Sequence, residues 1–403
     1  MRESTGVYIS IPFCKAKCSF CNFASGVFAA DRIAGYVDRL CAEIAGARAS
    51  AARLGAELPE HVDTVYFGGG TPSLLEPRVV ERIFAALRGE FTVAADAEIT
   101  VECAPGQLEE ATLEQYQREG MNRVSFGVQS FIDRESASVG RLHTGVECLA
   151  EMERMRRAGV GQRSLDLIVG LPHQTVASWR YSVDEALASG AEHVSVYMLE
   201  VDEDSRLGRE LLASGDRYRA GAVPDEDSCA DWYAEAVGWL GDGGVAQYEI
   251  SNFARTGCRS RHNIKYWQRK PYIGFGLDAH SMLRSATDPM GAVRWANPDE
   301  MEGYLGLGDG LAARALPGVI VDRIGRREAF EETLFLGLRM NSGVELERLR
   351  ADFGALVDEI SPSLAEVQEA GLLTQEDGCL RLTSAGRMVS NEVFGRLLLE
   401  PVA

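Results

Sequence analysis

The chain has 403 residues, of which 46% are hydrophobic and 25% are charged, as in an ordinary water-soluble globular protein. It carries 60 acidic and 41 basic side chains, a formal net charge of −19, which argues against a nucleic-acid partner because such binding depends on neutralising phosphates. Neither a run of about 18 apolar residues nor a signal peptide is present, so we expect no membrane span and no secretion.

The first half of the chain alternates strand-like runs with amphipathic stretches, which is the pattern of a parallel sheet with crossover helices. Strands are predicted at 7–11, 64–67, 98–102, 123–127, 164–169 and 193–198. Helices are predicted near 33–54, 76–88, 109–119, 145–158 and 177–188, and Thr175 is placed to cap the last of them. About six βα units suffice for a partial (β/α) barrel but not for a closed barrel of eight. The predicted fold class is therefore α/β, with residues 1–205 as its core.

The second half is divided into an accessory region, 206–324, and a C-terminal module, 325–403. The module is predicted to contain helices at 328–338, 346–353 and 361–370, a hairpin at 372–382 and a final helix at 385–398. Helices followed by a hairpin resemble a winged helix. Because residues 341–403 carry five basic and eleven acidic side chains, we expect the module to pack or to dock a partner rather than to bind DNA.

Three cysteines, Cys14, Cys18 and Cys21, lie on one short loop after the first predicted strand. A structural zinc site would need a fourth ligand, and none follows at finger-like spacing. A cubane iron–sulfur cluster tolerates three protein thiolates and leaves one iron free. The alternatives are three unrelated buried thiols or a degenerate zinc knuckle. An exposed cluster requires a reducing compartment, and the other cysteines do not form a disulfide framework, so we expect a cytoplasmic protein.

Unusual residues also follow the other predicted strands. The run Gly68-Gly-Gly-Thr-Pro72 follows the second strand, Glu102 ends the third, Gln129 follows the fourth and Asp166 lies on the fifth. In parallel α/β sheets, loops at the carboxyl ends of the strands converge and bind ligands. Glycine without a Cβ lets the backbone approach a ligand closely. Taken singly, each carboxylate could equally be a helix cap or a solvated loop residue.

The spacing of the three cysteines resembles the radical S-adenosylmethionine (SAM) superfamily, in which the open iron of a [4Fe-4S] cluster chelates SAM. Further motifs resemble the oxygen-independent coproporphyrinogen oxidase family, including its HemW branch of haem chaperones. They are Tyr8-Ile-Ser-Ile-Pro12, Asn122-Arg-Val-Ser-Phe-Gly-Val-Gln-Ser-Phe131, Arg141-Leu-His143 and Asp166-Leu-Ile-Val-Gly-Leu-Pro172. The resemblance implies that Cys14, Cys18 and Cys21 bind the cluster. It implies SAM contacts from Tyr8, Phe20, Gly69, Gly70, Thr71, Glu102, Gln129, Arg141 and Asp166. Family members carry Glu-x-Asn-Pro-Gly where this chain has Glu102-Cys-Ala-Pro-Gly106, so one amide is missing near the cofactor.

Two features favour the HemW branch. Decarboxylating enzymes of the family carry a further cysteine two residues after the third ligand, where this chain has Phe23. The run His262-Asn-Ile-Lys-Tyr-Trp267 matches a motif associated with haem binding in that branch. Imidazole is a common axial ligand of haem iron, and Tyr266 and Trp267 offer flat faces to a macrocycle. Basic residues of the segment 255–270 could pair with propionates. The alternative is a core histidine, two structural aromatics and a solvated basic loop; Cys258 and His280 are weaker candidate ligands.

The resemblance therefore implies a haem chaperone that binds haem, SAM and a [4Fe-4S] cluster and delivers haem to an acceptor, such as a respiratory haem protein. The alternative is an oxidative decarboxylase that converts the propionates of coproporphyrinogen III to vinyl groups by radical SAM chemistry. A radical SAM enzyme acting on RNA is disfavoured by the acidic balance. Whether SAM is cleaved, and whether the chain works as a homodimer, is left open.

Overall fold

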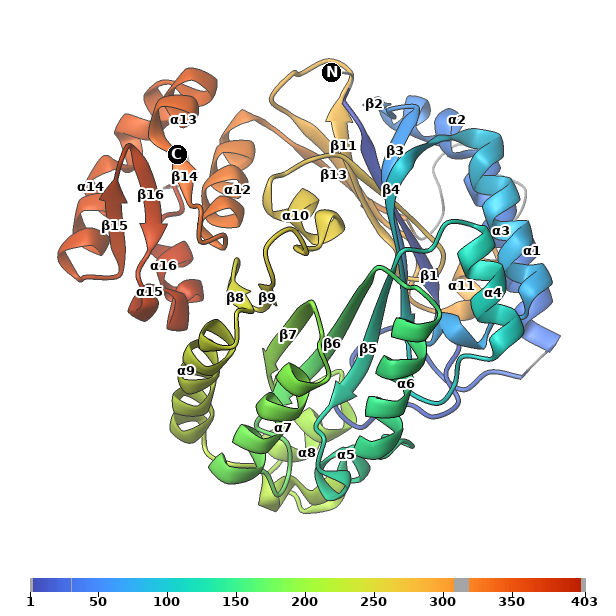
Figure 1. Cartoon of the computed structure of the whole chain (residues 1–403). Coiled ribbons are helices and arrows are strands. Elements are labelled where there is room, and N and C mark those ends of the chain that lie inside the picture. The colour runs from blue at the N-terminus through green and yellow to red at the C-terminus, as the bar shows by residue number, and fades with distance from the viewer. Residues whose placement is uncertain (1–2, 30, 308–318, 400–403) are drawn as a thin grey trace.

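The computed structural model describes residues 3–29, 31–307 and 319–399. A strongly curved sheet runs through the larger part of the molecule, with helices on its outer face (Figure 1). Its order is β13-β12-β11-β10-β1-β3-β4-β5-β6-β7-β9-β8, and β2 pairs with β11. The six predicted strands are confirmed as consecutive parallel neighbours: β1 Thr5–Ile11, β3 His61–Gly69, β4 Thr92–Cys103, β5 Arg123–Gln129, β6 Gln162–Val169 and β7 His193–Met198.

The five predicted helices of this half are found close to their expected positions, and a further short helix at Asp133–Ser138 was not predicted. The helices of this half are α1 Asp31–Ala45, α2 Ala47–Leu54, α3 Pro77–Glu90, α4 Glu110–Arg118, α5 Asp133–Ser138, α6 Gly145–Arg157 and α7 Val176–Ala188, with a short helix η1 at Pro72–Leu74. The single helix predicted over 33–54 is in fact two helices, because the chain leaves helical geometry at Gly46. Thr175 caps α7 as predicted, accepting a hydrogen bond from the amide of Ser178 at 3.2 Å.

The sheet extends beyond the six predicted strands on both sides. On one side β10 (Tyr272–Phe275) pairs parallel with β1 and is followed by the antiparallel strands β11 His280–Ser285, β12 Ala292–Ala296 and β13 Ile320–Ile324. On the other side β9 (Asn252–Ala254) pairs antiparallel with β7 and with β8 (Ala246–Gln247), and β2 is Ala56–Glu57. The remaining helices are α8 Arg206–Leu212, η2 Arg217–Ala222, α9 Glu226–Asp242, α10 Arg261–Trp267 and α11 Met301–Leu305.

The C-terminal module has its own hydrophobic core, separate from that of the large sheet. It contains α12 Arg326–Leu338, β14 Val344–Glu345, α13 Leu346–Phe353, α14 Ala355–Glu369, β15 Leu373–Glu376, β16 Cys379–Leu382, α15 Ser384–Met388 and α16 Ser390–Arg396. The predicted order of helices followed by a hairpin is confirmed. Helix α14 begins earlier than predicted because it continues through Pro362, and the predicted final helix is broken at Val389.

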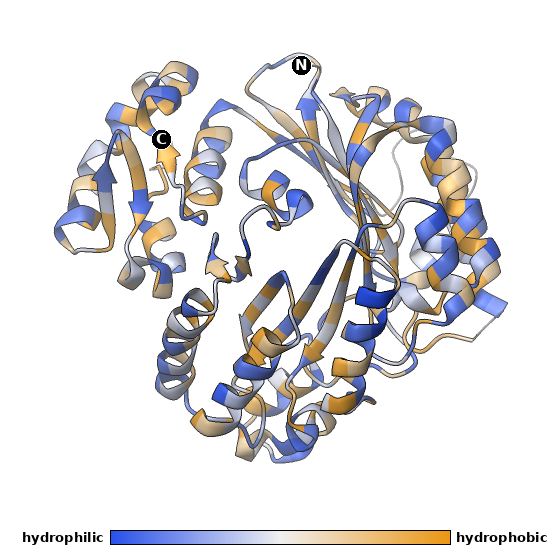
Figure 2. Ribbon diagram, in the orientation of Figure 1, coloured by the Kyte–Doolittle hydropathy of each residue, from blue (hydrophilic) through white to orange (hydrophobic). Residues whose placement is uncertain are grey.

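The two faces of the large sheet differ in chemistry, as the alternating blue and orange bands along its strands indicate (Figure 2). Apolar side chains such as Val7, Val65 and Val101 are fully buried in the core beneath the outer helices. Because successive residues of a strand point to opposite faces, their neighbours line the concave face. These neighbours are polar: Ser10, Thr64, Glu98, Thr100, Glu102, Ser125, Asp166 and Ser195. A polar concave face suits ligand binding. No described helix has the length and apolar character needed to cross a bilayer.

Candidate functional site

The three cysteines lie on the loop that connects β1 to α1. Two backbone hydrogen bonds close this loop at its base, from the amide of Gly26 to the carbonyl of Pro12 and from the amide of Cys14 to the carbonyl of Gly26, both at 2.9 Å. The amide of Cys21 donates to the carbonyl of Cys18 at 3.4 Å, so these two cysteines share one tight turn. All three thiols are free of disulfides.

The three thiols do not converge on a site for a single ion. Among the described residues, no group of three or more His, Cys, Asp or Glu side chains could hold one metal ion. A cubane does not require such convergence, because each thiolate binds a different iron. Burial raises the pKa of the Cys14 thiol, so a bound metal is needed to hold it as a thiolate. The guanidinium of Arg141 lies 3.5 Å from Sγ of Cys18 and supplies a positive charge beside the cluster site.

The glycine-rich loop after β3 packs directly on the cysteine loop. The amide of Gly70 donates to the carbonyl of Ile11 at 2.8 Å, and the amide of Thr71 donates to the carbonyl of Phe13 at 2.8 Å. A Cβ at position 70 would lie 2.7 Å from the Ile11 carbonyl oxygen and 2.8 Å from the Pro12 carbonyl carbon, so only glycine fits there. Gly69 has φ of 99°, in the region that favours glycine. The two predicted loops therefore form one structural unit.

Two carboxylates face the concave side close to these loops. Glu102 accepts hydrogen bonds from the Tyr66 hydroxyl at 2.8 Å and from the Gly69 amide at 3.2 Å. Removal from bulk water raises the pKa of Glu102 to about 7 and that of Asp166 to about 6. The hydroxyl of Ser125 donates to Asp166 at 3.4 Å. Near neutral pH both carboxylates are poised to ionise when a cationic ligand or hydroxyl donors arrive.

Several polar atoms beside the carboxylates are buried without a partner. Oε1 of Gln129 and Nε of Arg141 have no hydrogen-bond partner within the described chain. Gln129 also has φ of 71°, an uncommon conformation for a residue with a side chain. Unpaired buried polar groups are costly unless a ligand satisfies them. Both residues therefore fit the SAM contacts that the family motifs imply. Phe20, another implied contact, packs on a small apolar cluster that contains Ile168.

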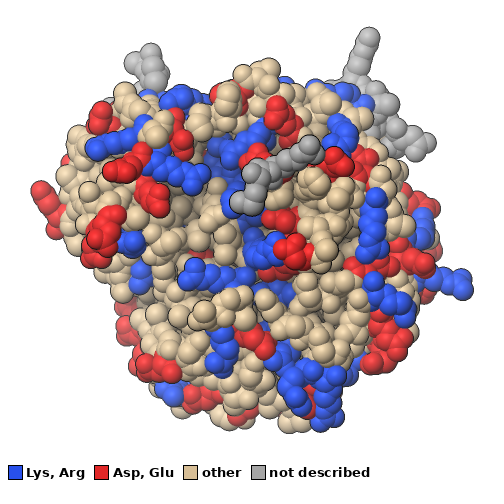
Figure 3. All heavy atoms as spheres, turned by 45° about the horizontal axis from the view of Figure 1, so that its top comes forward, with Lys and Arg blue, Asp and Glu red and all other residues tan. Residues whose placement is uncertain are grey.

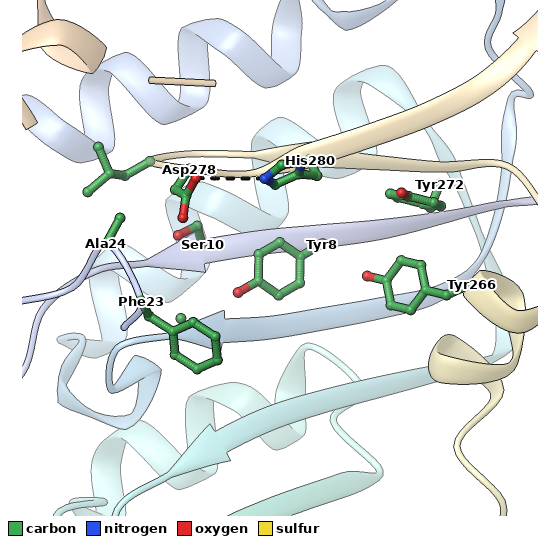
Figure 4. A pocket seen from close by; sticks show the side chains of 10 residues that line it. Tyr8, Ser10, Phe23, Ala24, Tyr266, Tyr272, Asp278 and His280 are labelled. Atoms are coloured by element: carbon green, nitrogen blue, oxygen red, sulfur yellow. Dashed lines mark ion pairs between the residues drawn. The ribbon is translucent and has the colours of Figure 1, made fainter. Parts of the chain in front are cut away.

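A cavity of about 320 Å³ opens beside the cysteine loop (Figure 4). One wall is formed by Tyr8 of β1, Tyr266 of α10 and Tyr272 of β10. Phe23, two residues after the third cysteine, lies at the opposite end, 60% exposed. The β10–β11 connection completes the lining with Asp278 and His280. The sequence did not indicate that Tyr272 and Asp278 line this cavity, and it suggested His280 only as a weaker candidate ligand.

His262 lies outside this cavity. Its side chain is buried, with 1% of the residue exposed. Nδ1 lies 2.8 Å from the hydroxyl of Thr64, and Nε2 lies 2.8 Å from the hydroxyl of Tyr266. Burial lowers the pKa of His262 to about 3, so the ring is neutral. Because both ring nitrogens are engaged, this conformation does not support the prediction that His262 is the axial haem ligand.

Two of the six basic residues of the segment 255–270 are buried in ion pairs, whereas Arg259, Arg261 and Lys270 are exposed. Lys265 is buried and pairs with Asp63 at 2.6 Å, and Arg269 is buried and pairs with Glu332 at 2.7 Å. Trp267 stacks against the guanidinium of Arg339, 4.3 Å from the ring centroid. Blue side chains run down the middle of the face shown in Figure 3, interspersed with red ones. Helix α10 thus packs against the amino-terminal end of the sheet, and the pairing of the exposed basic residues with propionates stays a prediction.

A parallel α/β sheet with a three-cysteine loop after its first strand defines the class of radical SAM proteins. Residues 8–186 match the Radical SAM superfamily, and residues 324–389 match the HemN C-terminal domain. The chain is 32% identical to the heme chaperone HemW of Bacillus subtilis, over 98% of this chain and 99% of that protein. It is 34% identical to the heme chaperone HemW of Synechocystis, over 97% and 87%.

Among solved structures, coproporphyrinogen III oxidase (HemN) from Escherichia coli superposes with a TM-score of 0.80. The match covers 98% of this chain and 90% of HemN, and at 22% identity it shows a shared fold. The chain belongs to the HemW family of radical SAM proteins, which confirms the predicted resemblance. Membership of the superfamily implies a [4Fe-4S] cluster and SAM.

Proposed function

We propose that this protein is a haem chaperone that binds haem at the carboxyl edge of the sheet and passes it to an acceptor haem protein, such as a respiratory one. The observation that carries the proposal is the identity of 32% and 34%, over almost the whole chain, to relatives named heme chaperone HemW. Phe23 supports it, because this exposed phenylalanine stands where the decarboxylating enzymes carry a further cysteine.

In this proposal the cofactors occupy the loops at the carboxyl edge. Cys14, Cys18 and Cys21 hold the [4Fe-4S] cluster, whose reduced form supplies an electron for SAM chemistry when it is bound. Glu102 and Asp166 accept hydrogen bonds from ribose hydroxyls or balance the sulfonium charge. SAM is further positioned by Tyr8, Phe20, Gly69, Gly70, Thr71, Gln129 and Arg141.

The three regions of the chain take separate roles. We assign cluster and SAM binding to residues 1–205, and the haem-facing wall to residues from 206–324 together with Tyr8 and Phe23 of the first region. The acidic C-terminal module, 325–403, docks the acceptor or a second copy of the chain in a homodimer. An oxygen-sensitive cluster requires a reducing compartment, so we place the protein in the cytoplasm.

The test is transfer of haem between proteins. The full-length protein, loaded with one equivalent of haemin, is mixed with an apo-haem protein, and the acceptor's Soret band is followed over time. Haem should reach the acceptor faster than from serum albumin loaded to the same level. Transfer that is no faster than from albumin contradicts the chaperone proposal.

Coproporphyrinogen III oxidation is the second candidate, favoured by the close likeness of the fold to HemN. The cluster-loaded protein is incubated anaerobically with SAM, a reductant and coproporphyrinogen III, and the products are identified by mass spectrometry. Decarboxylated product over several turnovers establishes the oxidase and overturns the chaperone. Formation of 5′-deoxyadenosine without decarboxylation would favour the haem chaperone function over the oxidase.

A further inference from the structure

We infer that His280, rather than His262, binds the iron of haem, and that the adjoining cavity receives one edge of the macrocycle. This inference rests on the proposed haem-binding function and assigns its ligand. It follows from the state of the histidines, the lining of the cavity and the way in which the His280 loop is held.

Three of the histidines have no ring nitrogen available to bind haem iron. The chain has six histidines, and the structure describes all of them. His262 and His193 are buried with both ring nitrogens engaged; in His193 they lie 2.7 Å from the Ser164 hydroxyl and 2.9 Å from the Tyr248 hydroxyl. His143 is also buried, and its Nε2 lies 3.1 Å from the carbonyl oxygen of Val128. None of these three presents an open nitrogen to a large ligand.

The remaining three histidines differ in where they lie relative to the cavity. His61 begins β3 at the amino-terminal edge, away from the cysteine loop. His173 is half-buried, with Nδ1 lying 3.2 Å from the guanidinium of Arg134. His280 has 60% of its side chain exposed and lines the cavity. Within the described part of the chain, neither of its ring nitrogens makes a hydrogen bond, since the nearby Asp278 carboxylate oxygen lies 3.7 Å from Nε2.

The cavity beside His280 suits the edge of a flat, apolar ring. Its aromatic wall is continuous, because Tyr266 and Tyr272 pack edge to face with centroids 4.6 Å apart. Burial raises the pKa of all three tyrosines of this wall, so their phenols stay protonated and serve as surfaces rather than as iron ligands. At about 320 Å³ the cavity is at the small end of ligand pockets, so it takes part of a macrocycle and leaves the rest exposed for hand-over.

Hydrogen bonds with buried side chains of helix α1 and with Asn297 hold the loop that precedes His280. The amide of Gly276 donates to the buried carboxylate of Glu43 at 3.0 Å, and the amide of Leu277 donates to the hydroxyl of Tyr36 at 3.0 Å. Asn297 donates to the carbonyl of Gly276 at 2.8 Å. These contacts fix the loop before any ligand arrives, which lowers the entropic cost of binding.

Asp278 completes the arrangement. Its backbone has φ of 56°, a costly conformation for a residue with a side chain, and its amide is tied to the carbonyl of Pro298 at 2.9 Å. In this conformation the carboxylate is turned towards the imidazole, as the dashed line in Figure 4 marks. At 3.7 Å the carboxylate makes no hydrogen bond to the ring, but its negative charge favours a metal cation bound close to the imidazole. Phe23 places the bound edge next to the cysteine loop.

The test is spectroscopic and uses the full chain with two probes, haemin and metal-free protoporphyrin IX. His280→Ala should remove the histidine-ligated signature of haemin in absorption and electron paramagnetic resonance. It should weaken haemin binding by more than about tenfold, since Asp278→Asn, which removes only the supporting carboxylate, should cost about tenfold. Protoporphyrin binding should stay unchanged, because it depends on the aromatic wall alone. His173→Ala, which removes a half-buried histidine outside the cavity lining, is the control and should bind both probes normally.

His280→Cys gives a second, positive test, because a thiolate at this position should replace the histidine spectrum by a thiolate one. A wild-type protein that binds no haemin overturns the proposed function itself. If the wild type binds haemin and His280→Ala keeps the same spectrum and affinity, the ligand assignment is wrong while the haem-binding proposal stands. If His280→Ala weakens the binding of haemin and of protoporphyrin equally, the assignment of His280 as iron ligand is also overturned, because His280 would then only shape the cavity.

Discussion

The imidazole of His262 lies almost flat against the ring of Tyr66, with centroids 5.2 Å apart and planes inclined by 28°. The hydroxyl of the same tyrosine donates to Glu102 at 2.8 Å. Helix α10 is therefore connected through one aromatic side chain to a carboxylate of the candidate SAM site. This connection assigns the histidine of the family motif a role in holding the sheet and the site together.

Substitution of His262 should affect stability more than haem binding. His262→Ala removes a buried ring and leaves the hydroxyls of Thr64 and Tyr266 unpaired. We expect the free energy of unfolding to fall by about 3 kcal/mol in urea denaturation. The folded fraction should still show the haemin spectrum of the wild type. Loss of that spectrum without any loss of stability would restore His262 as the iron ligand.

Replacement of Glu102 should remove a pH dependence of the free energy of unfolding. The pKa of Glu102 is about 7 in the folded state and about 4.3 in an unfolded chain. Between these values the folded state holds a proton that the unfolded state has released, so stability falls as pH rises through this window. Glu102→Gln should therefore stabilise the ligand-free protein at pH 8 by on the order of 3 kcal/mol, and most of the gain should vanish by pH 5.

The measurement for Glu102 is urea denaturation at both pH values, with the exposed Glu203→Gln as control. The control should show little change at either pH. A stability difference that is the same at pH 8 and pH 5 would contradict the raised pKa. In binding experiments Glu102→Gln should weaken the binding of SAM, since the substitution removes the negative charge of the side chain while keeping its shape.

Gly70→Ala should disrupt the cluster site. The added Cβ would lie within 3 Å of backbone atoms of Ile11, Pro12 and Phe13, none of which is the end of a flexible side chain. We expect a loss of about 2 kcal/mol and a lower iron content after anaerobic reconstitution. Gly89→Ala in α3 is the matched control, because nothing lies within 4 Å of its added Cβ. That substitution should stabilise the helix slightly; full iron content in Gly70→Ala would refute the close packing of the two loops.

Glu332 should be essential to the junction with the C-terminal module. It is buried and pairs with Arg269 at 2.7 Å and with Arg294 at 2.5 Å. Glu332→Ala leaves the buried Arg269 uncompensated, so we expect a loss of about 3–5 kcal/mol in denaturant unfolding. Removing the carboxylate of an exposed pair by Asp184→Ala should cost less than about 1 kcal/mol. Equal effects in the two variants would show that the junction depends on other contacts.

The predictable parts of the fold are those governed by local pattern. The six parallel strands were found because each is an apolar or β-branched run followed by glycine or another turn residue. Strand β10 was missed because Tyr272–Phe275 spans only four residues and joins β1 from far along the chain. Nothing local distinguishes it from a loop.

The candidate site divides in the same way. The cysteine and glycine loops were predicted because their spacing within a few residues sets their chemistry. His262 was ranked above His280 because motif and local composition do not reveal burial, which here depends on Thr64, almost two hundred residues earlier, and on Tyr266. His280 owes its place to Glu43 and Asn297, which no local pattern connects with it.

Helix α10 packs against the amino-terminal end of the sheet, with His262 and Lys265 so close to Gly6 that a Cβ there would clash. The sites proposed for both ligands lie towards the opposite, carboxyl edge. There the cavity at His280 is lined by Tyr8 and Gly69, two residues that the proposal also gives to SAM. On these assignments haem and SAM would meet at the same two residues, so the presence of SAM would help to decide when haem is released.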